Sequence, residues 1–129
     1  MMFDLPLDQL REYRPAVAEP DDFDEFWKSQ LEQANTFPLD ATFVPIDSVI
    51  RSAQVYDVAY AGHGGTRVCG WLLVPRQLDV HGPVVVEFVG YGGGRGLPVD
   101  WLTWSCAGFA HFVMDTRGQG GSWRRSDTA

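Results

Sequence analysis

The sequence predicts an α/β fold in which a β-hairpin leads into a parallel unit of strand, helix and strand. Apolar runs at residues 84–89 and 109–114 flank a helical pattern at residues 98–107, and two strand-like runs, at 53–60 and 67–74, flank a glycine turn. Adjacent parallel strands need a long connection, and a helix supplies it. Since such connections are almost always right-handed, we expect the loops that follow the two apolar strands to open on one edge of the sheet.

The first apolar strand ends in a loop that is the best candidate for chemistry. The run Val84 to Val89 follows Gly82-Pro83 and is almost free of charge, so we expect it to be buried on both faces, in the middle of a parallel sheet. Five glycines follow within Gly90 to Gly96. Ligands of parallel sheets gather at the carboxyl ends of the strands, and glycine lets backbone N–H groups approach a ligand closely.

The first 40 residues predict an arm and one helix. Residues 1–19 mix prolines and charges without a sustained period, apart from a short helical pattern near Leu7 to Tyr13, and we expect an extended arm laid over the domain. A longer helix begins after Pro20-Asp21-Asp22 and ends before Phe37-Pro38. Its apolar face is expected to pack into the core: Phe23, Phe26, Trp27, Leu31 and Ala34.

Residues 44–129 predict the start of a central sheet that forms one structural unit with residues 1–40. The glycine turn Gly62-His63-Gly64-Gly65 supplies the positive φ angles that a hairpin needs. Pro98 suits the first turn of the crossover helix, and Gly108 suits its end.

Composition restricts the classes of function. A chain of 129 residues with 45% hydrophobic content is long enough for one core of ordinary size. Its 10 basic and 17 acidic residues give a net charge of -7, which disfavours nucleic acid and anionic membranes as partners. No segment approaches roughly 18 consecutive apolar residues and the amino terminus lacks a signal-like pattern, so we expect a soluble, cytoplasmic protein.

The cysteines and histidines do not have the spacing of metal ligands. Cys69 and Cys106 are predicted to be buried thiols, since two cysteines make neither a disulfide framework nor a zinc site. His63 falls in the turn, His81 in a loop and His111 in a strand, where structural or solvent-facing roles are expected. We expect neither a metal nor a cofactor.

Three glycine-based motifs of known function are absent from the chain. A dinucleotide fingerprint would need glycine where Arg95 stands, and a phosphate loop would need a lysine that the glycines lack. The nearest approach to a hydrolase nucleophile elbow, Gly120 to Arg124, has arginine in place of the final glycine. What remains is a loop suited to stabilising an oxyanion, without a nucleophile.

Several sequence blocks in a fixed order cover almost the whole chain. The blocks are Phe3-Asp4-Leu5-Pro6-Leu7, Asp22-Phe23-Asp24-Glu25-Phe26-Trp27, Phe37-Pro38-Leu39-Asp40, Val55-Tyr56-Asp57-Val58, Gly70-Trp71-Leu72-Leu73-Val74-Pro75, the glycine loop with Asp100-Trp101-Leu102, and Phe112-Val113-Met114-Asp115-Thr116-Arg117-Gly118-Gln119-Gly120. On these blocks the chain resembles the amino-terminal part of the acetyl xylan esterase and cephalosporin C deacetylase family, carbohydrate esterase family seven, whose members have the α/β-hydrolase fold.

The resemblance implies a deacetylase that acts on acetylated sugars or other small acetyl esters without a metal or cofactor. It implies that Tyr91 offers its backbone N–H to the oxyanion, with Gly90, Gly92 and Gly93 shaping the loop. We expect Gly90 and Gly92 both to resist a β-branched side chain, which disfavours positive φ. The segment Arg117-Gly118-Gln119 matches the family's Arg-Gly-Gln motif and is expected to brace the neighbourhood of the site.

The resemblance also implies what this chain lacks. The catalytic serine, acid and histidine of the family lie beyond residue 129, so the chain alone is expected to be inactive. Both a fragment and a short protein remain open, and an in-frame G-x-S-x-G after Ala129 would separate them. With uncovered apolar strands, the chain is expected to form a homo-oligomer or to associate with a missing carboxyl-terminal part.

An alternative of another class is a non-catalytic carbohydrate-binding or protein-interaction module. Trp101, Trp104 and Trp123 lie near the glycine loops and would stack on a sugar or a partner surface. Exposure of these indole rings separates the alternative from the esterase.

Overall fold

The computed structural model describes residues 4–77, 82–120 and 126–128. The chain forms two compact units, Met1–Leu31 and Glu32–Ala129, which are described separately. The prediction that residues 1–129 form one unit, with the arm laid over the domain, stays a prediction.

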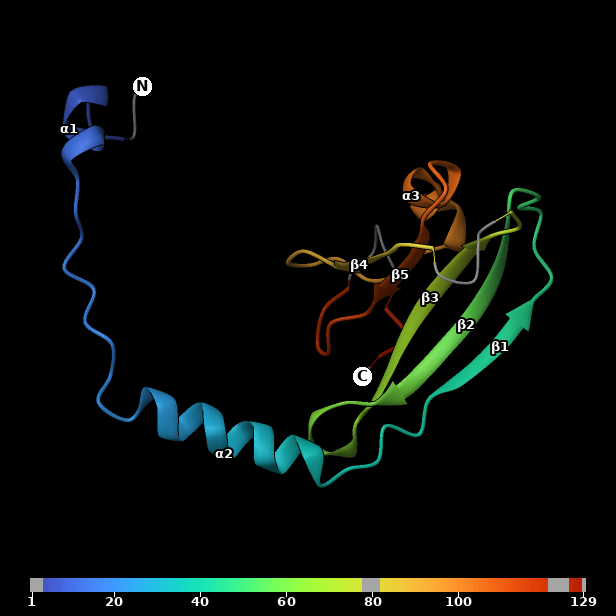
Figure 1. Cartoon of the computed structure of the whole chain (residues 1–129), viewed down its shortest axis with the longest axis horizontal. Helices are drawn as coiled ribbons and strands as arrows, with labels where there is room; N and C mark the ends of the chain where they lie inside the picture. The colour runs from blue at the N-terminus through green and yellow to red at the C-terminus, as the bar shows by residue number, and fades with distance from the viewer. Residues whose placement is uncertain (1–3, 78–81, 121–125, 129) are drawn as a thin grey trace. The chain divides into compact units, whose positions relative to one another are not determined.

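The first unit consists of a short helix, an extended segment and most of a longer helix (Figure 1). Helix α1 spans Leu7–Glu12, and α2 spans Phe23–Asn35 and continues into the second unit. Both confirm the sequence prediction, and α2 ends before Phe37-Pro38 as expected. Acidic residues occupy the first turn of α2, where they complement the positive end of the helix dipole.

The aromatic face of α2 is not part of a core in this chain, contrary to the prediction. None of the residues of α2 is buried. Trp27 instead meets Phe23 and Phe26 edge-on, with ring centroids 6.3 and 5.6 Å apart. The physical reason is that a helix buries its apolar stripe only against another layer of structure, which periodicity by itself does not supply.

The second unit is built on a five-stranded mixed sheet with the order β1-β2-β3-β5-β4 (Figure 1). Its strands are β1 (Thr42–Ile46), β2 (Ala53–Ala61), β3 (Arg67–Pro75), β4 (Val84–Phe88) and β5 (Ala110–Met114). Strands β2 and β3 form the predicted antiparallel hairpin. Its turn, η1 (His63–Gly65), holds Gly64 and Gly65 at φ of 69° and 72°.

The parallel unit is also confirmed, since β4 and β5 pair in parallel with Val85 opposite His111. Their connection contains a 3-10 helix, η2 (Pro98–Trp101), and the short helix α3 (Leu102–Cys106). Gly108 follows with φ of 91°, which suits the end of a helix. The antiparallel pairing of β3 with β5 joins the hairpin to the parallel unit, and the strand patterns alone did not predict it.

Strand β4 lies at an edge of the sheet, which corrects the prediction that it is central and buried on both faces. Val84, Val86 and Phe88 face outward, and Val86 is 51% exposed. Among the described residues, β4 pairs only with β5. An apolar run shows that a strand needs cover on both faces, but it does not show that the same chain provides that cover.

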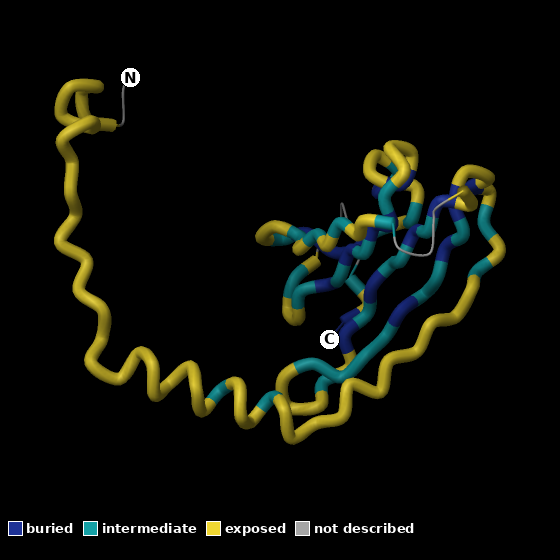
Figure 2. Tube along the Cα trace, in the orientation of Figure 1, coloured by how far each residue is buried: buried dark blue, intermediate teal, exposed yellow. Residues whose placement is uncertain are grey.

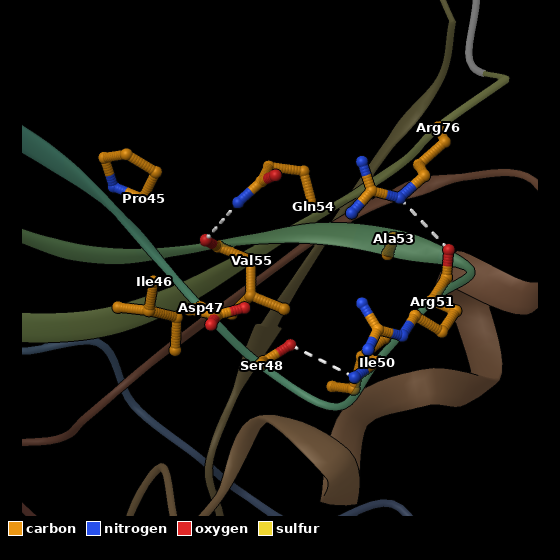
Figure 3. A pocket seen from close by; sticks show the side chains of 10 residues that line it. All are labelled: Pro45, Ile46, Asp47, Ser48, Ile50, Arg51, Ala53, Gln54, Val55 and Arg76. Atoms are coloured by element: carbon orange, nitrogen blue, oxygen red, sulfur yellow. Dashed lines mark hydrogen bonds between the residues drawn. The ribbon is translucent and has the colours of Figure 1, made fainter.

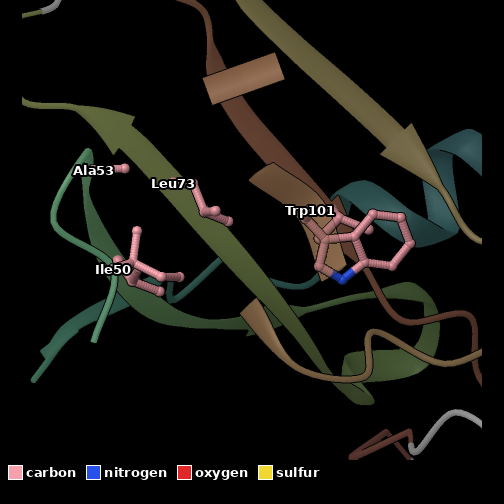
Figure 4. Packing of buried hydrophobic residues seen from close by; sticks show 6 residues of the cluster. Ile50, Ala53, Leu73 and Trp101 are labelled. Atoms are coloured by element: carbon pink, nitrogen blue, oxygen red, sulfur yellow. The ribbon is translucent and has the colours of Figure 1, made fainter. Parts of the chain in front are cut away.

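The core lies on the face of the sheet that η2 and α3 cover, and the buried positions concentrate in β2, β3 and β5 (Figure 2). Ile50 and Ala53 pack with Leu73 of β3, while Trp101 enters from η2 (Figure 4). The complete cluster is Ile50, Ala53, Val55, Leu73, Trp101 and Val113. This cluster packs between the strands on one side and η2 on the other. The loops at the sheet edge are therefore attached to a well-packed core.

The two cysteines differ from the prediction of buried thiols. Cys69 is partly exposed in β3, and Cys106 is exposed at the last position of α3. A helix of five residues turns one side to the core and the other to the surface, and Cys106 falls on the surface side.

Candidate active-site loop

The loops that follow β4 and β5 meet at the carboxyl edge of the parallel strands, as predicted. The glycine loop comes after Phe88, and the segment Asp115 to Gly120 follows Met114. Two short hydrogen bonds join them: the Gly92 N–H donates to Gln119 Oε1 at 2.6 Å, and the Arg95 N–H donates to Asp115 Oδ1 at 2.6 Å. The side chains of one loop therefore fix the backbone of the other.

Tyr91 stands at the tip of a tight turn in the glycine loop. The Gly93 N–H donates to the Gly90 carbonyl at 3.0 Å, which closes the turn around Tyr91 and Gly92. The Tyr91 residue is 98% exposed, and its N–H has no acceptor among the described residues. The N–H groups of Gly92 and Gly93 both donate hydrogen bonds, which distinguishes them from the Tyr91 N–H.

The three glycines of this turn have different roles. Gly92 has φ of 73°, a conformation that a β-branched residue resists. A side chain on Gly93 would meet the Gly90 carbonyl oxygen at 3.1 Å. Gly90 has neither restriction: its φ lies outside the left-handed region, and an added Cβ would have nothing within 4 Å. The expectation that Gly90 needs positive φ is therefore wrong.

The Arg117-Gly118-Gln119 segment is brought only partly into this neighbourhood. Gln119 contacts the glycine loop directly through Gly92. Arg117 points elsewhere, with Nη1 donating to Thr66 Oγ1 of the hairpin turn at 3.0 Å. Gly118, at φ of 72°, provides the bend between them.

Arg95 is a central residue of the site, although in the sequence it stands out only as the residue that interrupts a glycine motif. It is 4% exposed although it lies in a surface loop. Its Nη1 donates to Asp57 Oδ1 at 2.7 Å and to the Gly70 carbonyl at 2.8 Å. Its Nε and Nη2 both donate to Asp127 Oδ2, at 3.0 and 2.8 Å. The one signal in the sequence was a charged residue inside an otherwise small and apolar loop.

The surroundings of Arg95 favour its charged form. Burial lowers the pKa of the Arg95 guanidinium, but hydrogen bonds to Asp57 and Asp127 and their negative charges outweigh that effect and raise this pKa. The guanidinium also lies 3.8 Å from the centroid of the Trp71 ring, in cation–π geometry. These contacts therefore stabilise the charged form of Arg95.

Asp115, the second residue that sequence reasoning missed, forms the other half of this network. Its side chain is fully buried and lies directly after β5. Oδ1 accepts from the Arg95 N–H, and Oδ2 accepts from the Asp127 N–H at 2.8 Å and lies 3.8 Å from Arg95 Nε. A buried carboxylate held by backbone donors and a cation ties three separate segments together.

Gly70 offers a direct test of how closely this region is packed. A Cβ at Gly70 would lie 2.8 Å from the Phe112 ring and 2.8 Å from the Val113 carbonyl. We expect Gly70→Ala to lower the free energy of unfolding by about 1–3 kcal/mol, because the neighbouring strand cannot yield. Gly90→Ala, at an open position, is the control and should change it by less than about 0.5 kcal/mol. Equal effects in urea unfolding would contradict this packing.

The histidines occupy the predicted elements where the structure describes them. His63 is exposed in the turn, and His81 lies outside the described residues. His111 is buried in β5, with Nδ1 3.0 Å from the Trp101 carbonyl. Its Nε2 lies 3.2 Å from Glu87 Oε2, which is within the range of an ion pair. The two groups are not aligned as a hydrogen bond requires. This histidine joins β4, β5 and η2.

The structure describes two of the three tryptophans on which the alternative of a binding module depends, and the two differ in exposure. Trp101 is 7% exposed and belongs to the core, with Nε1 donating to the Arg95 carbonyl. Trp104 is exposed and packs edge-on against Phe109. Trp123 lies outside the described residues.

A polar pocket of about 250 Å³ lies away from the glycine loop. It is lined by the connection from β1 to β2 and by Arg76, whose Nε donates to the Arg51 carbonyl (Figure 3). In the hairpin register, Ala53 pairs with Pro75 at this end and Ala61 pairs with Arg67 at the other. The pocket is therefore at the end of the sheet opposite the candidate site.

In the described part of the chain, no three histidine, cysteine, aspartate or glutamate side chains are grouped as metal ligands would be. No helix there is long and apolar enough to cross a membrane.

A mixed sheet whose parallel strand ends in this loop is the beginning of an α/β-hydrolase domain, and solved structures agree. Acetyl xylan esterase from Paenibacillus sp. R4 is 38% identical, with a TM-score of 0.82 over 92% of this chain. Acetyl xylan esterase 1 from Thermoanaerobacterium sp. JW/SL YS485 is 33% identical, with a TM-score of 0.80 over 93% of this chain. The chain spans 38% of the length of each.

The model of the acetyl xylan esterase family matches residues 1–129, and the chain belongs to this family.

Proposed function

We propose that this chain is the amino-terminal part of a serine esterase that removes acetyl groups from sugars, and that it provides one arm of the oxyanion hole. In an α/β hydrolase, one oxyanion donor comes from the loop after the strand that precedes the first crossover helix. The glycine loop has that position in the fold. Two observations carry the proposal: the family membership, and a Tyr91 N–H that has no acceptor among the described residues.

In the proposed reaction, a serine from beyond residue 129 attacks the carbonyl carbon of the acetyl ester. A histidine takes the serine proton, and the carbonyl oxygen becomes an oxyanion that accepts a hydrogen bond from the Tyr91 amide. Collapse of this intermediate expels the sugar oxygen, which receives the proton from the histidine. Water then attacks the acetyl-enzyme, releasing acetate and restoring the serine.

The role proposed for Gln119 is to hold the turn that carries this donor. Its side-chain oxygen accepts a hydrogen bond of 2.6 Å from the Gly92 N–H, so the peptide unit between Tyr91 and Gly92 has a fixed orientation. Donors that are oriented before the reaction stabilise developing charge without the cost of reorganisation. Gln119 takes no part in proton transfer in this proposal.

The proposal predicts that the 129-residue chain alone does not hydrolyse 4-nitrophenyl acetate above the buffer rate. An oxyanion donor without a nucleophile and a base cannot make or break the ester bond. The assay compares the chain with the protein that carries this sequence and an in-frame G-x-S-x-G after Ala129. Turnover by the chain alone that a serine-directed inhibitor abolishes would contradict the absence of a nucleophile. Inactivity of the longer protein toward acetyl esters would contradict the function.

We also propose that the uncovered side of the sheet associates with other chains or with the rest of the hydrolase domain. Val84 and Val86 face outward from the edge strand, beside Phe43 of β1 and Phe112 of β5 around an apolar groove. An apolar edge is a template for pairing with another chain, and lysine on such an edge opposes it.

We expect the 129-residue chain to elute above its monomer mass at low micromolar concentration in size exclusion with light scattering. Val86→Lys should shift it toward the monomer, because it places a charge on the edge strand. Val49→Lys, on the exposed connection between β1 and β2, is the matched control and should leave the mass unchanged. A sharp monomer peak and a cooperative melt of the unmodified chain would rule out this association.

A further inference from the structure

We propose that Arg95 is a positioning residue of the oxyanion loop, fixing the turn that presents the Tyr91 N–H, an inference that rests on the proposed function. Tyr91 itself is almost fully exposed, so its own side chain does little to fix its backbone. The turn must be held from its base. Arg95 is the charged residue at that base, four positions along the chain from Tyr91.

The Arg95 side chain is attached to three other segments of the second unit. Every nitrogen of the guanidinium donates a hydrogen bond, to Asp57 on β2, to the Gly70 carbonyl on β3, or to Asp127. Its flat face lies on the Trp71 ring at 3.8 Å. A planar guanidinium that donates a hydrogen bond from each nitrogen and stacks on an indole ring is held in a single orientation.

The Arg95 backbone is held on both sides by other groups. Its N–H donates to Asp115 Oδ1 at 2.6 Å, and its carbonyl accepts from Trp101 Nε1. Gly93 and Gly94, which link it to the turn, are both buried. Glycine has no side chain of its own to set its conformation, so the anchored arginine fixes one end of this short link. Gln119 fixes the other end through Gly92.

Charge gives a second reason why this position is arginine. Asp57, Asp115 and Asp127 lie around the Arg95 guanidinium, with closest ion-pair distances of 2.7, 3.8 and 2.8 Å. Lysine would keep the positive charge but lose the fork and the stacking, because its ammonium is a compact point charge on a flexible stem. Arg95→Lys therefore separates geometry from charge.

The test uses the longer protein that contains this sequence and an in-frame G-x-S-x-G after Ala129. It compares the Arg95→Lys variant with the Arg67→Lys variant. Arg67 forms an exposed ion pair with Asp40 at 3.7 Å in the same sheet, which makes it the matched control. We expect Arg95→Lys to lower kcat for 4-nitrophenyl acetate by about 10- to 100-fold, somewhat less than the loss of a whole oxyanion donor, with KM within about threefold. The control should change kcat by less than about twofold.

Hydrogen exchange supplies a readout that does not depend on activity. In Arg95→Lys, we expect the amides of residues 90–96 to exchange at least about tenfold faster, while those of the β2 and β3 hairpin keep their protection. Faster exchange throughout the hairpin, or unchanged exchange in the loop, would overturn the positioning role. A kcat equal to that of Arg67→Lys would overturn it as well. Faster loop exchange in a protein that lacks acetyl esterase activity would support the positioning role and contradict the proposed function.

Discussion

Replacing Asp115 with alanine is expected to lower the free energy of unfolding by about 3–5 kcal/mol, a large part of the stability of a domain of this size. Its carboxylate is fully buried and accepts from the backbone N–H groups of Arg95 and Asp127. Alanine would remove these two hydrogen bonds and one negative charge from beside Arg95. Urea unfolding followed by tryptophan fluorescence measures the change.

The control for this experiment is Asp47→Ala, the same substitution at an exposed position. Asp47 lies between β1 and β2, at the far end of the sheet from the glycine loop. Surface substitutions of this kind change stability by less than about 0.5 kcal/mol. A loss for Asp115→Ala that is no larger than the loss for Asp47→Ala would mean that the buried network contributes little to stability.

Replacing Gly92 with valine is expected to reduce kcat toward acetyl esters by about 100-fold or more in the protein that carries this sequence. Valine resists φ of 73°, so the turn would relax and the Tyr91 N–H would leave its position. No steric clash is needed, since an added Cβ at Gly92 would have nothing within 4 Å. The rate of 4-nitrophenyl acetate hydrolysis, with folding checked by circular dichroism, measures the effect.

Two substitutions beside Gly92 act as its controls. Tyr91→Phe should keep kcat within about threefold, because the proposed donor is the backbone and one exposed hydroxyl is all that is removed. Gly90→Ala should also be tolerated, since Gly90 has neither a left-handed φ nor a crowded Cβ position. A loss of about 100-fold in Tyr91→Phe would assign the chemistry to the phenol instead.

Elements whose causes are local could be predicted from the amino-acid sequence. Alternating β-branched and aromatic residues around Gly64 and Gly65 specify a hairpin, because only a few turn geometries join two such strands. Two apolar runs separated by a helical segment specify a parallel pair, because no shorter connection can reverse the chain twice. The glycine loop followed from the same logic, and with it the edge of the sheet where the site lies.

Which side chains hold that loop depends on contacts between segments that are distant in the sequence. Arg95 meets Asp57, Asp115 and Asp127, which are 38, 20 and 32 residues away in the sequence, so no local pattern relates them. Gln119 likewise reaches Gly92 across 27 residues, although the matching motif had already marked it. The edge position of β4 is also a tertiary result, since an apolar strand looks the same in sequence whether its neighbour is present or not. Local sequence sets backbone preference over a few residues, whereas the satisfaction of a buried charge depends on every segment that packs around it.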